Sequence, residues 1–295
     1  MPPKEAPVKL SFAEILNKVK ENQKEAKDPF DFASVSDLKE LGPDDYIKLG
    51  DWWSKPTNLP GLPFKRMTLI AGDSDSGKSS FAIQVIKAAQ QQGVGTIYIE
   101  TENKTTAADF VNWGVDPDQV VMAQSFVLED MFETALKAWE EIVKVAPETP
   151  LLLVIDSMGN TVTKFDEDLD LGDNTKPGGK GSALRRCLNK LAGRLIKAKN
   201  KVSVLLISYT YDNIGSVGRT NAGGKALQFF PSLIYQTKRM GWMEKTQDGN
   251  KIRVGAKVKW DLYKNHIKKN DPGLKNIVFG INDEGITFVE KDSSN

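Results

Sequence analysis

The residues best suited to chemistry in this chain lie between Gly72 and Ser79. They fit the pattern G-x-x-x-x-G-K-[ST] at every fixed position, as Gly72, Asp73, Ser74, Asp75, Ser76, Gly77, Lys78 and Ser79. In this pattern the glycines let backbone amides point at phosphate oxygens, and the start of a following helix adds partial positive charge. Lys78 would reach the β- and γ-phosphates, while the Ser79 hydroxyl would hold Mg²⁺. The stretch, with the adjoining Ser80, predicts a site for a nucleoside triphosphate.

The flanking sequence contains the elements that such a site needs. The apolar run 67–71 predicts a strand before the loop, and the pattern of residues 80–92 predicts a helix after it. A glycine-serine turn that matched the phosphate-loop pattern by accident would need neither the strand before it nor the helix after it. Further strands are expected at 96–99, 119–123, 151–155 and 202–208, and helices at 105–113, 128–145 and 182–199. This alternation predicts an α/β fold with a central, mostly parallel sheet flanked by helices. A β-rich C-terminal end follows at 232–238, 254–263, 277–281 and 286–289.

Carboxylates follow two of the expected strands. Asp156 ends the run 151–155, whose apolar character throughout indicates a strand buried on both faces. A carboxylate there would lie in the crevice where α/β sheets bind ligands and would order Mg²⁺ and its waters, rather than only cap the next segment. Glu100 and Glu102 follow another strand, and either could polarise the water that attacks the γ-phosphate. Two solvated carboxylates are the alternative, and the pattern alone does not choose.

Composition excludes several other classes of chemistry. The chain has 295 residues, 40% hydrophobic and 27% charged, with a net charge of +1 and a single cysteine and histidine. One cysteine, Cys187, excludes an internal disulfide and argues against a cysteine-based zinc site. The single histidine argues against catalysis by a Cys-His or Ser-His pair. No apolar run approaches the ~18 residues of a membrane span, and the N-terminus lacks a signal-peptide core. We therefore expect a cytoplasmic protein that does not enter membranes.

Basic residues gather after Asp156. Residues 174–201 hold nine lysines or arginines and no acidic residue, and they follow an acidic segment at 166–170. A glycine-lysine loop that leads into a basic helix suits a phosphate backbone, although a solvated helix face explains some of these charges. A second glycine-rich loop, 209–224, carries tyrosines that could stack on bases. The DNA-binding candidates of the two segments are Lys176, Lys180, Arg185, Arg186, Tyr211, Asn213, Arg219, Gly223, Gly224 and Lys225.

The N-terminal region looks separate from the core. Residues 1–28 are polar around one amphipathic pattern, which predicts a lone helix followed by a tether. The segment Phe30-Asp31-Phe32-Ala33 comes next. It could pack on its own core or dock on a neighbouring subunit, and these residues alone leave both open. The expected division is a helix and arm at 1–45 and a core at 46–295.

The order of these features resembles the RecA recombinase core, and more narrowly its phage branch, the UvsX type. The resemblance runs from about residue 45 to 290. Beyond the phosphate loop it rests on Gly61-Leu62-Pro63, Trp113-Gly114-Val115-Asp116, Asp156-Ser157, Lys190-Leu191-Ala192-Gly193, Gly223-Gly224-Lys225-Ala226-Leu227-Gln228-Phe229 and Lys264-Asn265-His266-Ile267. It implies ATP and Mg²⁺ as cofactors, a DNA-dependent ATPase, and helical filaments on single-stranded DNA that pair and exchange strands with double-stranded DNA in recombination and repair. A loading or mediator protein is a further implied partner, and a phage-encoded protein would act in the host-cell cytoplasm.

The resemblance also assigns roles that the residues alone do not. Glu102 takes the place of the catalytic glutamate, and Lys264 that of a lysine that reaches into the neighbour's ATP site. Segments 163–182 and 210–222 take the places of the two DNA-binding loops. Tyr209 stands where bacterial members have a glutamine that senses the γ-phosphate, and His266 where a second trans lysine is expected; both are departures. Phe30 and Ala33 resemble the F-x-x-A plug that joins eukaryotic recombinases into polymers.

Two alternatives remain beside an active recombinase. The same core drives hexameric helicases and ring-shaped ATPases, which are motors or switches. A non-catalytic mediator paralogue would bind ATP with little DNA-stimulated turnover, and the departure at Tyr209 favours that interpretation. The two expected DNA-binding loops and Gly223-Gly224 favour the recombinase.

Overall fold

The computed structural model describes residues 11–24, 40–170, 179–212, 219–221, 226–247, 249–268 and 276–289. It divides into two units, Met1–Gly42 and Pro43–Asn295. In the first unit, α1 (Phe12–Lys24) begins with a capping box: the Ser11 amide donates to Glu14 Oε2 at 2.7 Å, and the Glu14 amide donates to Ser11 Oγ at 3.3 Å. A helix is present where the amphipathic pattern predicts one. Among the described helices, none combines the length and the apolar character that crossing a bilayer requires.

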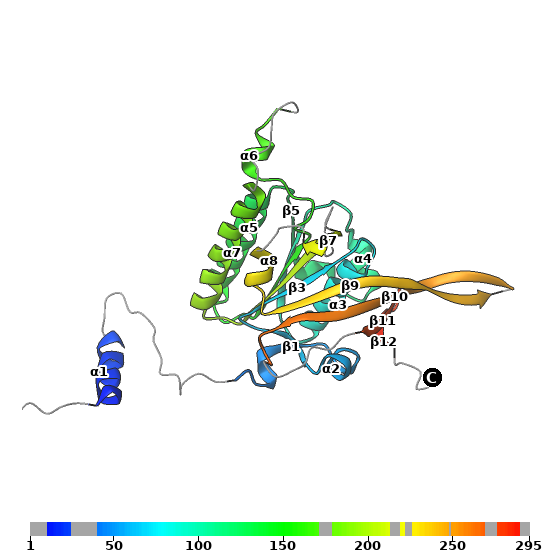
Figure 1. Cartoon of the computed structure of the whole chain (residues 1–295). Coiled ribbons are helices and arrows are strands. Elements are labelled where there is room, and N and C mark those ends of the chain that lie inside the picture. Colours follow the sequence, from blue (N-terminus) through cyan, green and yellow to red (C-terminus); the bar gives the residue numbers. More distant parts are fainter. Residues whose placement is uncertain are drawn as a thin grey trace, which may run out of the picture. The chain divides into compact units, whose positions relative to one another are not determined.

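The second unit is an α/β domain (Figure 1). Its strands are β1 (Tyr46–Lys48), β2 (Gly61–Pro63), β3 (Met67–Gly72), β4 (Gly95–Glu100), β5 (Val120–Gln124), β6 (Leu151–Asp156), β7 (Val202–Asp212), β8 (Arg219–Asn221), β9 (Leu233–Gln247), β10 (Asn250–Asn265), β11 (Ile277–Asn282) and β12 (Gly285–Phe288). Its helices are α2 (Asp51–Thr57), α3 (Lys78–Gln91), α4 (Ala107–Asn112), α5 (Leu128–Val145), α6 (Lys164–Glu167), α7 (Gly179–Lys197) and α8 (Ala226–Phe229), with short 3₁₀ turns η2 (Pro43–Asp45) and η3 (Pro117–Gln119).

The main sheet has the order β12-β11-β10-β9-β3-β7-β6-β4-β5. The strands from β9 to β5 in this order are parallel, whereas β10, β11 and β12 add to the sheet in antiparallel fashion. The carboxyl ends of β3, β4, β6 and β7 therefore meet at one edge, where ligands bind in open α/β sheets. The predicted α/β fold with a mostly parallel sheet and a β-rich end is confirmed.

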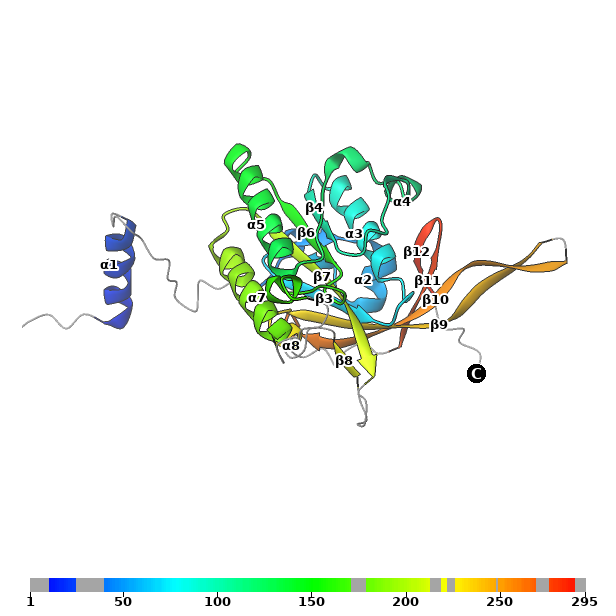
Figure 2. The same ribbon diagram turned by 90° about the horizontal axis from the view of Figure 1, so that it is seen from above.

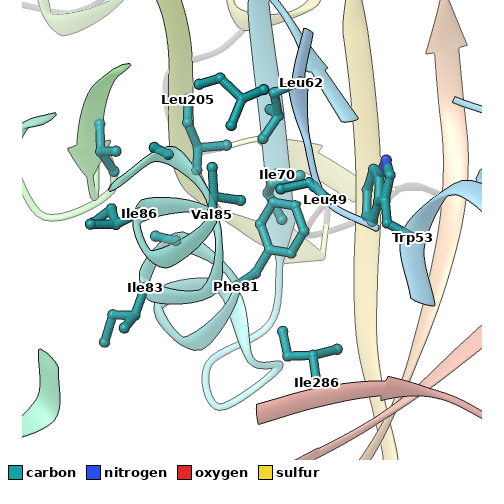
Figure 3. Close-up of a cluster of buried hydrophobic side chains, with 14 of the residues drawn as sticks. Leu49, Trp53, Leu62, Ile70, Phe81, Ile83, Val85, Ile86, Leu205 and Ile286 are labelled. Atoms are coloured by element: carbon teal, nitrogen blue, oxygen red, sulfur yellow. The ribbon is translucent and has the colours of Figure 1, made fainter. Parts of the chain in front are cut away.

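Helices cover both faces of the sheet, so the central strands are apolar on both sides (Figure 2). On β6, Leu152 and Val154 enter the core beneath α3, while Leu153 and Ile155 enter the core beneath α5 and α7. This is why residues 151–155 show no polar alternation. The face beneath α3 is filled by Phe81, which packs against Trp53 of α2 with ring centroids 5.1 Å apart (Figure 3). The packing fixes the start of α3, and hence the phosphate loop, against β3.

Two segments differ from the sequence-based expectation. β9 and β10 form a hairpin much longer than the expected strands 232–238 and 254–263, and it extends past its neighbours in both views (Figures 1 and 2). No residue of 238–247 or 250–257 is buried, so this outer half lies beyond the core, even though Ile252, Val254 and Ala256 occupy alternate positions. The second glycine-rich loop is also partly strand, because β7 continues to Asp212 and pairs with β8.

Candidate nucleotide-binding site

The phosphate loop joins the end of β3 to the start of α3, as the sequence predicts. Gly72 has no room for a side chain, since an added Cβ would lie 2.0 Å from Thr237 Oγ1 on β9. Gly77 has a φ of 73°, in the left-handed region that favours glycine. The buried Ser76 hydroxyl donates to the Asp73 carbonyl at 2.7 Å and lies 2.7 Å from Thr237 Oγ1. The loop is thus held by its own backbone and by β9.

Lys78 is folded back onto the loop in this structure. Its side chain is almost fully buried, and Nζ donates to the Asp73 carbonyl at 2.6 Å. The ammonium also lies 4.5 Å from the centroid of the Tyr209 ring. Burial lowers the pKa of Lys78 from 10.5 to about 8, against the opposing charge of Asp156. A phosphate would supply the close anionic partner that this nearly buried cation lacks among the described residues.

Asp156 lies at the end of β6, buried beside the start of α3. Its carboxylate is hydrogen-bonded to Ser79 and accepts from the Tyr98 hydroxyl at 3.1 Å. Burial raises the pKa of Asp156, although these hydrogen bonds and the charge of Lys78 oppose the rise. The residues present fit Mg²⁺, because a hydroxyl backed by a carboxylate offers hard oxygen donors and leaves the other positions to phosphates and water. Ser79 and Asp156 would therefore hold the metal.

The two glutamates after β4 are used differently. Glu100 is buried, and its carboxylate accepts from the backbone amides of Glu102 at 2.9 Å and Asn103 at 2.6 Å. It holds the turn that carries Glu102. Glu102 points toward Asp156 and the phosphate loop, where its Oε1 accepts from the Ser157 hydroxyl at 3.1 Å. The structure thereby separates two carboxylates that the residue pattern alone left equivalent, and Glu102, the one that the resemblance favoured, faces the site.

Tyr209 joins the phosphate loop to Glu102. It is the parallel register partner of Gly72, so it lies at the carboxyl end of β7 beside the start of the phosphate loop. Its hydroxyl donates to Glu102 Oε1 at 2.6 Å. Burial raises the pKa of Glu102, but hydrogen bonds from Lys104, Tyr209 and Ser157 outweigh this effect and hold that pKa below its usual value. The sequence pattern does not reveal the contact between Tyr209 and Glu102, because 107 positions separate the two residues.

The two residues expected to act across an interface lie at the end of β10 and just beyond it. Lys264 Nζ donates to the carbonyls of Gln228 at 2.8 Å and Phe229 at 2.9 Å, on α8 of the same chain. Burial lowers the pKa of Lys264. His266 has an exposed side chain, and its amide donates to the Ser232 carbonyl at 2.9 Å. Among the described contacts, neither Lys264 nor His266 touches the phosphate loop of its own chain.

The described part of the basic segment contains α7, which begins at the same edge as the phosphate loop. Lys180 Nζ donates to the Gly159 carbonyl at 2.7 Å. Arg185 is exposed, whereas Arg186 lies 3.8 Å from Glu129 on α5 and so has an acidic partner within the chain. Tyr211 and Arg219 lie on the paired strands β7 and β8. Other proposed residues fall outside the described part of the chain: Lys176, Asn213, Gly223, Gly224, Lys225, and the oligomerisation pair Phe30 and Ala33.

A contact that the sequence did not suggest ties the phosphate loop to the long hairpin. Asp75 Oδ2 lies 3.7 Å from Arg239 on β9, and the Arg239 guanidinium lies 4.7 Å from the Trp242 ring centroid. Arg253 of β10 lies 4.8 Å from the same ring centroid. The stack braces the hairpin against the loop. The sequence pattern did not reveal this contact, because Asp75 and Arg239 are far apart in the chain.

The fold and the site define a phosphate-loop α/β protein. The chain belongs to the RecA family: the RecA N-terminal domain matches residues 55–286. Among curated relatives, Protein RecA of Fusobacterium nucleatum is 30% identical over 226 residues, covering 76% of this chain and 56% of the relative. Protein RecA of Sulfurovum sp. is 27% identical over 236 residues, covering 78% and 63%. That of Lactococcus lactis is 27% identical over 231 residues, covering 77% and 57%. The chain thus spans less than two thirds of these relatives' length, and the resemblance to the RecA family is confirmed.

Proposed function

We propose that this chain is an ATP-dependent recombinase that assembles on single-stranded DNA as a helical filament and promotes homologous pairing and strand exchange with double-stranded DNA. The observation that carries the proposal is a convergence at one sheet edge. Lys78, Asp156 and Glu102 meet there, beside Lys180 at the start of the basic helix. ATP hydrolysis and DNA binding would therefore take place at neighbouring positions on one edge of the sheet.

Hydrolysis would use groups that the structure brings together. Lys78 would leave the Asp73 carbonyl for the β- and γ-phosphates, and Ser79 with Asp156 would hold Mg²⁺, which neutralises developing charge on the phosphates. Glu102 would orient the attacking water and take its proton. Its low pKa keeps it ionised at neutral pH, as a proton acceptor must be.

Lys264 and His266 would complete the site from a neighbouring protomer. Cations from a second subunit stabilise charge that develops during phosphoryl transfer. Lys264 would have to leave the carbonyls of Gln228 and Phe229, and its burial-lowered pKa favours exchange of these neutral partners for a phosphate. Hydrolysis would then depend on assembly.

Assembly would use the N-terminal arm and the exposed edge of the sheet. β5 ends the described strand order, so one side of its backbone has no strand partner among the described residues. Val121, Met122 and nearby Phe126 are exposed there, at 47%, 39% and 54%. An extended segment from the next protomer can add to such an edge and place apolar side chains in it. We assign that role to the segment with Phe30 and Ala33.

The narrower assignment is to the phage branch of the family, supported by Thr210-Tyr211 after the altered sensor position. A protein of this kind would work on DNA in the cytoplasm, with a loading partner, and would use ATP and Mg²⁺. A second candidate function is that of a non-catalytic mediator. One observation favours it: the Tyr209 hydroxyl donates a hydrogen bond to the carboxylate of Glu102.

Strand exchange between oligonucleotides separates these functions. Protein, ATP and Mg²⁺ are mixed with a single strand and a duplex labelled at one end with a fluorophore and quencher. An active recombinase displaces the labelled strand from a homologous duplex and leaves a heterologous duplex intact. A mediator alone produces no displacement from either duplex, and that result would refute the proposed activity.

A further inference from the structure

Tyr98 contacts Asp156 of the candidate metal site, although the reaction described above gives this tyrosine no role. It is the parallel register partner of Val154 on β6, two residues before Asp156, so Tyr98 and Asp156 share one face of the sheet. The side chain of Tyr98 is fully buried, and its hydroxyl donates to Asp156 Oδ2 at 3.1 Å. A rigid, buried ring that directs its hydroxyl at one carboxylate is suited to holding that carboxylate in place.

Two contacts with the region of α4 hold Tyr98 itself. Its ring packs edge-on against Phe110 of α4, with ring centroids 5.6 Å apart and the planes at 90°. Its hydroxyl is also hydrogen-bonded to the side chain of Thr105, just before α4 begins with a capping box. Because the single hydroxyl proton of Tyr98 goes to Asp156, Thr105 is the donor in this second bond. The position of the Tyr98 hydroxyl is therefore set from two sides.

Asp156 needs such a support, because two other groups act on the same carboxylate. Ser79 is hydrogen-bonded to it and is its partner at the proposed metal site, while the charge of Lys78 attracts it. Without the hydroxyl of Tyr98, the carboxylate would be free to turn toward the ammonium of Lys78. Hydrogen bonds from surrounding residues orient the groups that hold a metal, and their loss typically lowers metal affinity or activity by about 10–100-fold.

We propose that Tyr98 is a positioning residue for Mg²⁺ binding, whose hydroxyl holds the Asp156 carboxylate beside Ser79 in the arrangement that receives the metal with ATP. The inference rests on the proposed binding of ATP and Mg²⁺. It deepens that proposal, because it names a side chain outside the phosphate loop that sets the affinity for the metal. Tyr98 acts through Asp156 alone, and no covalent step is involved.

The test is the Mg²⁺ dependence of nucleotide binding by the full chain, followed with a fluorescent, non-hydrolysable ATP analogue. Tyr98→Phe keeps the ring and removes the hydroxyl. The Mg²⁺ concentration that produces half of the metal-dependent increase in binding is expected to rise about tenfold. The Kd of the analogue in EDTA should stay close to that of wild type. Tyr235→Phe on β9 is the matched control, because it removes another fully buried tyrosine hydroxyl and should leave both values unchanged.

Thr105→Val is a second variant, which keeps Tyr98 and removes only the donor to its hydroxyl. It should raise the half-maximal Mg²⁺ concentration in the same direction but by less. An unchanged Mg²⁺ dependence in Tyr98→Phe, or in Thr105→Val if Tyr98→Phe does not fold, would overturn the inference. An equal rise in Tyr235→Phe would overturn it as well. A wild-type protein whose binding of the analogue does not respond to Mg²⁺ would instead refute the proposed use of ATP and Mg²⁺.

Discussion

The Tyr209 hydroxyl donates a 2.6 Å hydrogen bond to Oε1 of Glu102 and so joins two distant parts of the chain. Tyr209 belongs to β7, which continues into the second candidate DNA segment, and Glu102 follows β4. The sheet order β7-β6-β4 brings them across one strand. Any signal that moves the end of β7 therefore reaches the group that would activate water.

Glu102→Gln is expected to lower ATP turnover by about 10²–10⁴-fold, because the amide keeps the shape but cannot accept a proton. ATP binding should persist, since Lys78, Ser79 and Asp156 remain. Filaments formed with ATP should then fail to disassemble. Turnover is measured by phosphate release and ATP binding by a fluorescent analogue. Turnover equal to wild type would remove Glu102 from the mechanism.

Glu100→Gln is expected to lower the free energy of unfolding, in addition to any effect on ATP turnover. Its buried carboxylate accepts from the amides of Glu102, Asn103 and, at 3.3 Å, Lys104. An amide in its place leaves buried donors without an acceptor, which costs about 1–3 kcal/mol. Thermal unfolding followed by circular dichroism should show a lower midpoint in Glu100→Gln than in Glu102→Gln. Equal midpoints would argue against a structural role for Glu100.

ATP affinity in EDTA is expected to fall above about pH 8, where Lys78 loses its proton in the free protein. Burial lowers the pKa of Lys78, so its ammonium is charged below about pH 8. Above that pH, Lys78 must take up a proton when ATP binds. The Kd should then rise by about tenfold per pH unit. Lys78→Arg keeps its charge throughout and should give a flat profile. Parallel curves for the two proteins would contradict this account.

Met122→Glu should block filaments while ATP binding by single protomers persists. The change puts a charge on the edge of β5, where Met122 is 39% exposed, so the fold should tolerate it. Phe30→Glu should have the same effect from the arm. Ile196→Glu, at a side chain 84% exposed on α7, is the control. Normal filaments of Met122→Glu in electron micrographs would exclude β5 as the docking edge.

A mixing experiment tests whether Lys264 acts on the neighbouring subunit. Lys264→Ala and Glu102→Gln should each be nearly inactive alone. In an equal mixture, roughly a quarter of head-to-tail interfaces would pair an intact Glu102 with an intact Lys264, and turnover should return in that proportion. Turnover that stays at the level of the single variants would place both groups in one protomer's site.

The sequence was sufficient for the parts of the site that depend on local pattern. The phosphate loop needs fixed spacing between Gly72 and Lys78, and Asp156 is marked by the apolar run before it. Both could be predicted because flanking strand and helix patterns are short-range signals. The fold class followed from the same alternation.

The remaining features depend on contacts between distant strands. Backbone amides that donate to the carboxylate of Glu100 turn that residue inward and leave Glu102 to face the site. The sheet order brings Tyr209 to Glu102. The length of the β9–β10 hairpin escaped prediction because its outer half buries no face. Apolar residues at alternate positions, such as Ile252 and Val254, stay exposed there, and only the pairing of the two strands shows how far the hairpin extends.

The most direct test of the proposed function is ATP turnover with and without single-stranded DNA, with electron microscopy of the same samples. An active recombinase should show strong stimulation by DNA together with long helical filaments. Closed rings would assign the chain to the helicase-like ATPases, and filaments with negligible turnover would assign it to the mediators. Either of these results would contradict an active recombinase.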